Sequence, residues 1–203
     1  MIEKLFSKGA DMEYDNAKLT EAIQEWSRGI EGNALPEWET FPSIELYMDQ
    51  VIALINQYLE IFEADREEKD YVVTAAMVSN YVKMKIVPAP VKKRYTKVHL
   101  AYLVMVCTLK QTLSMEMIKK IIPVDMEEEQ VRQVYASFVQ NQKKTFAKLT
   151  ELMREQKFEK ATEAEDAGDF VLQTAIFSTL ARTLTKKILS VQEGQTEDQR
   201  PGQ

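Results

Sequence analysis

The stretch that decides the expected fold is Met77–Pro88, which runs Met-Val-Ser-Asn-Tyr-Val-Lys-Met-Lys-Ile-Val-Pro. Two further stretches follow: Lys-Lys-Arg-Tyr-Thr at Lys92–Thr96 and Leu-Ser-Met-Glu-Met-Ile-Lys-Lys-Ile-Ile at Leu113–Ile122. Together they predict a short helix, a turn with two prolines, a return through three consecutive cations, and another helix. A helix of this width fits the major groove of DNA, and an adjacent basic hairpin can contact the neighbouring backbone.

The apolar pattern of the short helix within Met77–Pro88 separates a core side from an exposed side. Val78, Tyr81 and Val82 recur at helical spacing, and we expect them to face a core. Ser79 and Asn80 then lie on the other side of the helix. There an amide and a hydroxyl can hydrogen-bond to base edges or to phosphates.

Charge is distributed unevenly along the chain. The whole sequence has a net charge of −6, which by itself disfavours a nucleic-acid partner. However, residues Tyr71–Met115 contain no Asp or Glu, and all 32 acidic residues lie outside them. A basic patch on an acidic body can bind a polyanion locally, although chance segregation of charge on a solvated face is the alternative. The cations of this segment are Lys83, Lys85, Lys92, Lys93, Arg94, Lys97 and Lys110.

Apolar residues at helical spacing predict helices along the rest of the chain. One helix is expected to begin at Asn16 and a second after Ser43. The loop between them carries Trp38 and Phe41, which we expect to pack into a core. Further helices are expected at about Thr74–Met84, from Thr96, from Ser114 to about Pro123, from a capping box of Asp125 and Glu128, and after Gly168.

The expected fold class is all-α: a winged helix-turn-helix with a short wing, followed by long antiparallel C-terminal helices. The helix after residue 125 resembles the one through which many regulators dimerise, so we expect a homodimer. The alternative is that the two long helices pair antiparallel within one protomer. The expected organisation is an N-terminal helix (1–34), the winged domain (35–124), a C-terminal helical or dimerisation region (125–191) and a disordered tail (192–203).

The order of these motifs resembles that of the MerR-type winged-helix regulators. In that family Thr-Ile-Arg-Tyr-Tyr, Gly-Leu-Ile-Pro, Arg-x-Tyr and Phe-Ser-Leu-x-x-Ile follow one another. The resemblance implies a recognition helix, a wing and a later helix. The matching residues here are Tyr81, Ile86-Val87-Pro88, Lys93-Arg94-Tyr95, and Leu113-Ser114-Met115 with Ile118.

Three positions depart from the MerR pattern. Ser79 and Asn80 stand where an arginine and an aromatic residue are usual, so we expect weaker phosphate contacts there. Lys85 replaces the usual glycine, so we expect a different turn if that glycine has a positive φ.

The longer string also resembles an uncharacterised bacterial family, domain of unknown function 1836. The resemblance covers roughly residues 35 to 125 and implies a shared fold with a DNA-binding role. The motifs that carry it are Leu35-Pro-Glu-Trp38, Leu-Tyr-Met-Asp-Gln at Leu46–Gln50, Asn-Tyr-Val-Lys at Asn80–Lys83, and the Lys-Lys-x-Tyr of the wing.

These observations predict a DNA-binding transcriptional regulator that binds duplex DNA as a dimer and responds to an unknown effector or protein partner. The alternative is a helical protein-interaction module that keeps the winged scaffold without binding DNA. Overall acidity and the methionines Met115 and Met117 favour that alternative. The expected DNA-binding residues are Ser79, Asn80 and Lys83 towards the groove, Lys92, Lys93 and Arg94 on phosphates, and Lys85 and Lys97 beside them.

Catalysis and cofactors find little support in the sequence. His99 is the single histidine and lacks partners for a metal site, so we expect it near a phosphate or at the surface. Cys107 is the single cysteine, and we expect it to be a small core residue. There is no glycine-rich phosphate loop. We therefore predict no enzyme, no cofactor and no metal.

The chain is expected to be cytoplasmic and not to bind a membrane. No stretch approaches the roughly 18 uninterrupted apolar residues that a membrane span needs. The residues Met1–Phe6 lack the features of a signal peptide. A lone cysteine fits a reducing compartment.

Overall fold

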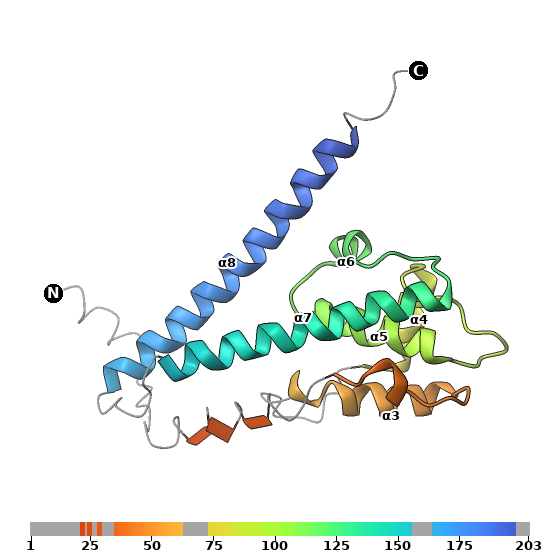
Figure 1. The fold of residues 1–203 in the computed structure, drawn as a ribbon, viewed down its shortest axis with the longest axis horizontal. Helices are drawn as coiled ribbons and strands as arrows, with labels where there is room; N and C mark the ends of the chain where they lie inside the picture. Colours follow the sequence, from red (N-terminus) through yellow and green to blue (C-terminus); the bar gives the residue numbers. More distant parts are fainter. Residues whose placement is uncertain are drawn as a thin grey trace. The chain divides into compact units, whose positions relative to one another are not determined.

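A computed structural model describes residues 35–62, 73–155 and 164–197, with short helical pieces between 21 and 29 (Figure 1). Most of the predicted N-terminal helix and residues 63–72 lie outside the described residues. The described part contains helices and isolated bridges but no extended strand, which confirms an all-α fold class. The helices are α3 (Met48–Tyr58), α4 (Ala75–Lys83), α5 (Lys97–Lys110), α6 (Met115–Ile121), α7 (Glu128–Glu155) and α8 (Ala164–Glu197), with 3-10 helices at Trp38–Thr40 and Glu60–Phe62.

The chain divides into two compact units, which are described separately. One comprises residues 32–146, and the other combines 1–31 with 147–203. The first unit is built around α5, whose residues from His99 to Cys107 are all buried. A helix that is apolar on every side must be surrounded by other elements. Both α3 and α6 contact α5, and α4 contacts α3.

The first half of α7 belongs to the same core. Val131, Tyr135 and Val139 are fully buried in it, and the Tyr135 hydroxyl donates a 2.7 Å hydrogen bond to the Pro36 carbonyl. These residues therefore pack within the protomer and cannot line a dimer seam, which corrects the role predicted for this part of the helix. Trp38 is also buried, with its ring centroid 6.4 Å from that of Tyr135.

Three predicted helix starts are confirmed, since α4, α5 and α6 begin directly after Thr74, Thr96 and Ser114, whereas the predicted starts of α3, α7 and α8 are wrong. The side chains of Thr74 and Ser114 accept hydrogen bonds from backbone N–H groups in the first turns of α4 and α6, as capping residues do. By contrast, α3 begins at Met48 and not after Ser43. Leu46 is withdrawn from the helix because its backbone pairs with that of Tyr95.

The start of α7 also differs from the prediction. Asp125 has a φ of 60° and lies outside the helix. The Glu127 N–H instead donates a 3.0 Å hydrogen bond to the Gln130 side chain. The capping contact at the start of α7 is therefore made by Glu127 and Gln130. It lies two residues later than the predicted capping box of Asp125 and Glu128.

The second unit contains α8, which differs from the prediction at both ends. It begins at Ala164, before Gly168, and continues to Glu197, so residues 192–197 of the predicted disordered tail are helical. Helix-favouring residues such as Gln192 and Glu193 explain the longer C-terminal end. Six large apolar residues of α8 are exposed among the described residues and form an apolar stripe; the stripe consists of Leu172, Ile176, Phe177, Leu180, Leu184 and Ile188.

A buried asparagine joins α3 to the start of α4. The Asn56 side chain donates to the Val73 carbonyl and accepts from the Val73 N–H, both at 2.9 Å. Both residues are buried, so neither backbone group can turn to water instead. This contact fixes the position of the start of α4 relative to α3.

We predict that Asn56→Ala lowers the free energy of unfolding by about 2–6 kcal/mol, because two buried backbone groups lose their partners at about 1–3 kcal/mol each. Urea unfolding followed by circular dichroism measures this loss. Gln57→Ala, at an exposed position of the same helix, is the control and should change stability by less than about 0.5 kcal/mol. Equal effects of the two substitutions would contradict the assignment.

Candidate nucleic-acid interface

Helix α4 has one buried and one polar side. Val78 and Tyr81 are buried, as predicted, and anchor the helix to the core. Ser79, Asn80 and Lys83 are exposed on the opposite side. The helix therefore presents small polar groups and one cation to the solvent.

The end of α4 is closed by a Schellman motif centred on Lys85. The Ile86 N–H donates to the Tyr81 carbonyl at 3.0 Å, and the Lys85 N–H donates to the Val82 carbonyl at 2.9 Å. Lys85 has a φ of 55°, the left-handed conformation that glycine usually adopts at this position. The predicted change of turn geometry is therefore wrong. Complete burial of Ile86 and the two hydrogen bonds hold the lysine in this conformation.

The predicted wing is a tight turn at Val91–Arg94. The Arg94 N–H donates to the Val91 carbonyl at 2.9 Å, and the two residues form an isolated antiparallel bridge. The central residues Lys92 and Lys93 have φ values of 50° and 62°. Two successive positive φ angles correspond to a type I′ turn, in which Asn-Gly is the preferred pair. The connection between α4 and α5 extends beyond the ends of the helices (Figure 1). Both lysines are exposed.

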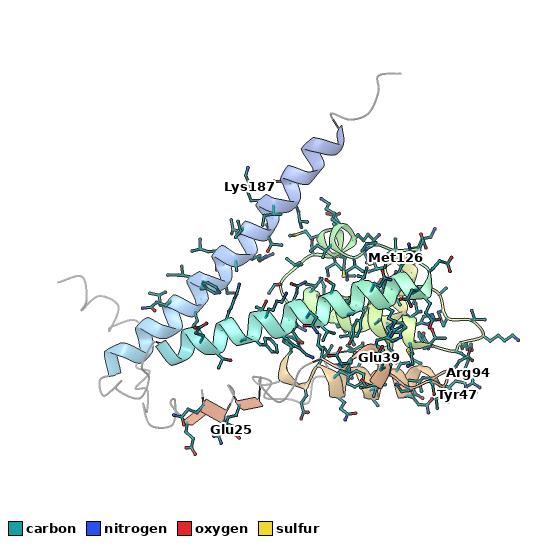
Figure 2. The ribbon with its side chains drawn as sticks, viewed as in Figure 1. Glu25, Glu39, Tyr47, Arg94, Met126 and Lys187 are labelled. Carbon is teal, nitrogen blue, oxygen red and sulfur yellow. The ribbon has the colours of Figure 1, made fainter. Side chains whose placement is uncertain are left out.

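A second bridge fixes the base of this turn. Leu46 and Tyr95 exchange backbone hydrogen bonds of 2.8 and 2.9 Å, and both side chains are buried. Neighbouring residues on paired extended segments point to the opposite side. Tyr47 and Arg94 accordingly meet outside, with the Arg94 guanidinium carbon 3.6 Å from the centre of the Tyr47 ring (Figure 2).

The basic residues of the turn and of α4 have no acidic partner among the described residues. Elsewhere in the described residues, ion pairs join Arg132 to Glu39 and Glu129, and Lys143 to Glu37. Glu37 and Glu39 are thus neutralised by cations of α7. The Arg132 hydrogen bond holds the pKa of Glu39 below its ordinary value.

The predicted cations differ in how exposed they are. The Lys97 ammonium lies 3.4 Å from the Trp38 carbonyl and is partly buried, whereas Lys83, Lys85, Lys92 and Lys93 are exposed. No hydrogen bond among the described residues links the polar side of α4 to the tip of the turn. The candidate interface therefore consists of two groups, one on the helix and one on the turn.

The position of His99 corrects the expectation of a surface residue or phosphate neighbour. The side chain is 6% exposed, and its Nδ1 accepts a 3.0 Å hydrogen bond from the Thr96 N–H. Its ring packs edge-on against Tyr95, at 5.4 Å between centroids. Burial lowers the pKa of His99, and the nearby backbone of Ala89 opposes this effect. His99 therefore supports the base of the turn from inside.

Cys107 is a core residue, as predicted. It is 2% exposed, and burial raises the pKa of its thiol to about 12. Such a thiol stays protonated and is a poor nucleophile or metal ligand. The described part of the chain holds no cluster of three or more metal-ligating side chains.

A family model described as a domain of unknown function (DUF1836) matches residues 36–138. The chain belongs to this family. The matched region of the DUF1836 chain contains α3 to α6, the first part of α7 and the complete basic turn. Comparisons with curated proteins and with solved structures gave no match. None of the described helices is long and apolar enough to cross a membrane.

Sequence reasoning missed the contribution of the segment before α3. The apolar pattern that predicts a helix after Ser43 includes Ile44 and Tyr47, which occur at helical spacing with Met48 and Val51. In the structure Ile44 and Tyr47 are 67% and 52% exposed. The signal that could have found the true helix start was Gln50, whose side chain accepts a 2.9 Å hydrogen bond from the Tyr47 N–H.

We predict that the support given by His99 makes this DUF1836 chain less stable as the pH falls below about 6.5, the ordinary pKa of histidine. The pKa of His99 is lowered in the folded protein, so the unfolded chain binds the proton first and gains from acidification. This contribution is present above the unfolded pKa and is lost as the pH falls towards the folded pKa.

Urea unfolding of the wild type and of His99→Gln at several pH values between about 7.5 and 5.5 isolates the histidine contribution from that of the carboxylates. The wild type should lose more stability over this interval than the variant. Parallel pH profiles would show that His99 does not titrate differently in the two states.

Proposed function

We propose that this protein binds duplex DNA through the basic segment, as a transcriptional regulator with a MerR-like winged helix-turn-helix. In this proposal α4 approaches the major groove and the turn contacts the backbone. Ser79, Asn80 and Lys83 face the groove, while Lys85, Lys92, Lys93, Arg94 and Lys97 provide the cationic surroundings.

The observation that carries the proposal is the choice of lysine at three left-handed positions. Lys85, Lys92 and Lys93 have φ values of 55°, 50° and 62°. A residue with a side chain costs about 1–2 kcal/mol more than glycine in this conformation. Local stability thus favours glycine at each position, yet each carries an exposed cation. Strained backbone of this kind clusters at functional sites.

The surrounding charges support the same proposal. These lysines have no acidic partner among the described residues, so their charges remain open to a ligand. Neutralisation of phosphates by lysine and arginine supplies most of the sequence-independent affinity for DNA. Exposed lysines on a turn beside a polar helix suit this role.

One double substitution tests both function and strain. We predict that Lys92→Asn combined with Lys93→Gly raises the free energy of unfolding by about 1 kcal/mol, because the pair suits a type I′ turn. The double variant should also bind random-sequence duplex DNA more weakly. The slope of log affinity against log salt should fall by about 1 to 2, at roughly 0.9 for each phosphate that is no longer neutralised. Fluorescence anisotropy at several salt concentrations measures the slope.

Two further double variants serve as controls. Lys92→Gln with Lys93→Gln removes the same charge but retains the strain, so binding should weaken without a gain in stability. Lys144→Gln with Lys148→Gln removes two exposed cations outside the basic segment and should leave the slope unchanged. Absence of wild-type binding near about 50 mM salt at micromolar protein would overturn the proposal, because non-specific binding alone should be detectable there.

We also propose a homodimer whose contact surface is the exposed apolar stripe of α8. Dimers suit two-fold operators, and the described residues leave this stripe uncovered. Light scattering should give twice the chain mass of 23.4 kDa. A monomer that nevertheless binds DNA would exclude the dimer and retain the DNA-binding proposal, whereas a stable complex with another protein that covers the turn would favour an interaction module.

A further inference from the structure

The paired segments that meet at Leu46 and Tyr95 place an aromatic ring beneath the arginine of the turn. We propose that Tyr47 is a positioning residue, which holds the Arg94 guanidinium ready for a two-point contact with a phosphodiester of duplex DNA. This inference rests on the proposed DNA binding. It assigns a role to a residue that precedes α3 and lies outside the basic segment.

The register of the bridge makes the pairing specific. Leu46 and Tyr95 point inward and are 5% and 4% exposed. Tyr47 follows Leu46 and Arg94 precedes Tyr95, so in this antiparallel pairing the two residues point outward and face each other. The backbone of Tyr47 is fixed in turn by the 2.9 Å hydrogen bond from its N–H to the Gln50 side chain. The backbone that carries the ring is therefore held in place before any ligand arrives.

The stacking geometry leaves the donors of Arg94 open to a ligand. The guanidinium carbon is 3.6 Å from the ring centre, so the ring occupies one face of the cation. The N–H donors of a guanidinium lie in its plane and point away from a ring that covers the face. Among the described residues no carboxylate pairs with Arg94. The in-plane fork can therefore receive an external oxyanion.

A phosphodiester is a better ligand for the Arg94 guanidinium than an anion with a single acceptor atom would be. Two phosphate oxygens can accept parallel hydrogen bonds from one guanidinium, and this arrangement fixes orientation as well as affinity. The two neighbouring lysines add charge without orientation, since an ammonium is a compact point charge. Stacking on Tyr47 reduces the rotamer freedom that Arg94 would otherwise lose on binding. Tyr47 thus acts through Arg94.

A double-mutant cycle tests this role with random-sequence duplex DNA as the ligand. Tyr47→Leu should weaken binding about two- to fivefold, the fold-change that corresponds to an exposed cation–π contact. Tyr47→Phe keeps the ring and should bind nearly as the wild type does. In the Arg94→Ala background, Tyr47→Leu should have no further effect, because its target is absent.

Two outcomes of the cycle would overturn the inference. An equal loss of affinity from Tyr47→Leu in both backgrounds would show that Tyr47 acts independently of Arg94, for example by contacting the DNA itself. A loss from Tyr47→Phe as large as that from Tyr47→Leu would assign the effect to the hydroxyl. Either result would leave the proposed DNA binding intact. If the wild type binds no DNA, the proposed function and this inference both fail.

A spectroscopic measurement on the free protein checks the positioning step without DNA. The Nε–H signal of Arg94, observed by nitrogen-15 NMR, should be shifted upfield because the guanidinium lies over the face of the Tyr47 ring. The shift should persist in Tyr47→Phe and vanish in Tyr47→Leu. An Arg94 signal at the position of a solvent-exposed arginine in the wild type would overturn the inference.

Discussion

The pair of backbone hydrogen bonds between Leu46 and Tyr95 is the contact on which the candidate interface depends. It joins the segment before α3 to the segment before α5, with hydrogen bonds of 2.8 and 2.9 Å. Because both side chains are buried, a shift of one residue would turn Leu46 and Tyr95 outward, so the register is strongly specified. The pairing closes the base of the turn, delays the start of α3 and places Tyr47 against Arg94.

Beyond this contact, the basic surface is organised by backbone conformation more than by side-chain spacing. Lys85, Lys92 and Lys93 occupy left-handed positions at the end of α4 and at the tip of the turn. The buried core from Val78 to Cys107 holds these positions, since the strain of each must be balanced by contacts elsewhere. Meanwhile Glu37 and Glu39 pair with cations of α7, which leaves the lysines of the turn without acidic partners among the described residues. Stability and charge are thus supplied by different parts of one unit.

Local sequence signals predicted much of this unit, and the exceptions have physical reasons. Helical periodicity and capping residues identified α4, α5 and α6, because each of these helices packs an apolar side and begins after Thr74, Thr96 or Ser114. Periodicity misplaced the start of α3, since Ile44 and Tyr47 have helical spacing but are withdrawn by the pairing of Leu46 with a residue distant in sequence. A non-local hydrogen bond leaves no periodic signal.

Other errors had the same origin. The burial of His99 follows from its packing against Tyr95, which the sequence around a lone histidine does not encode. The left-handed lysine at position 85 is imposed by the Schellman hydrogen bonds and the burial of Ile86, so tertiary context overrides the preference for glycine. The cationic composition of the site was predictable from sequence. The contact of Arg94 with Tyr47 was not, because it depends on the unforeseen register.

Protection of lysines from chemical acetylation by duplex DNA tests the central claim most directly. Mass spectrometry of the protein labelled with and without DNA distinguishes the individual lysines. We expect Lys92 and Lys93 to become several-fold less reactive in the complex, while the exposed Lys144 of α7 keeps its reactivity. Unchanged reactivity of Lys92 and Lys93 under conditions in which DNA is bound would contradict a DNA-binding role for the turn.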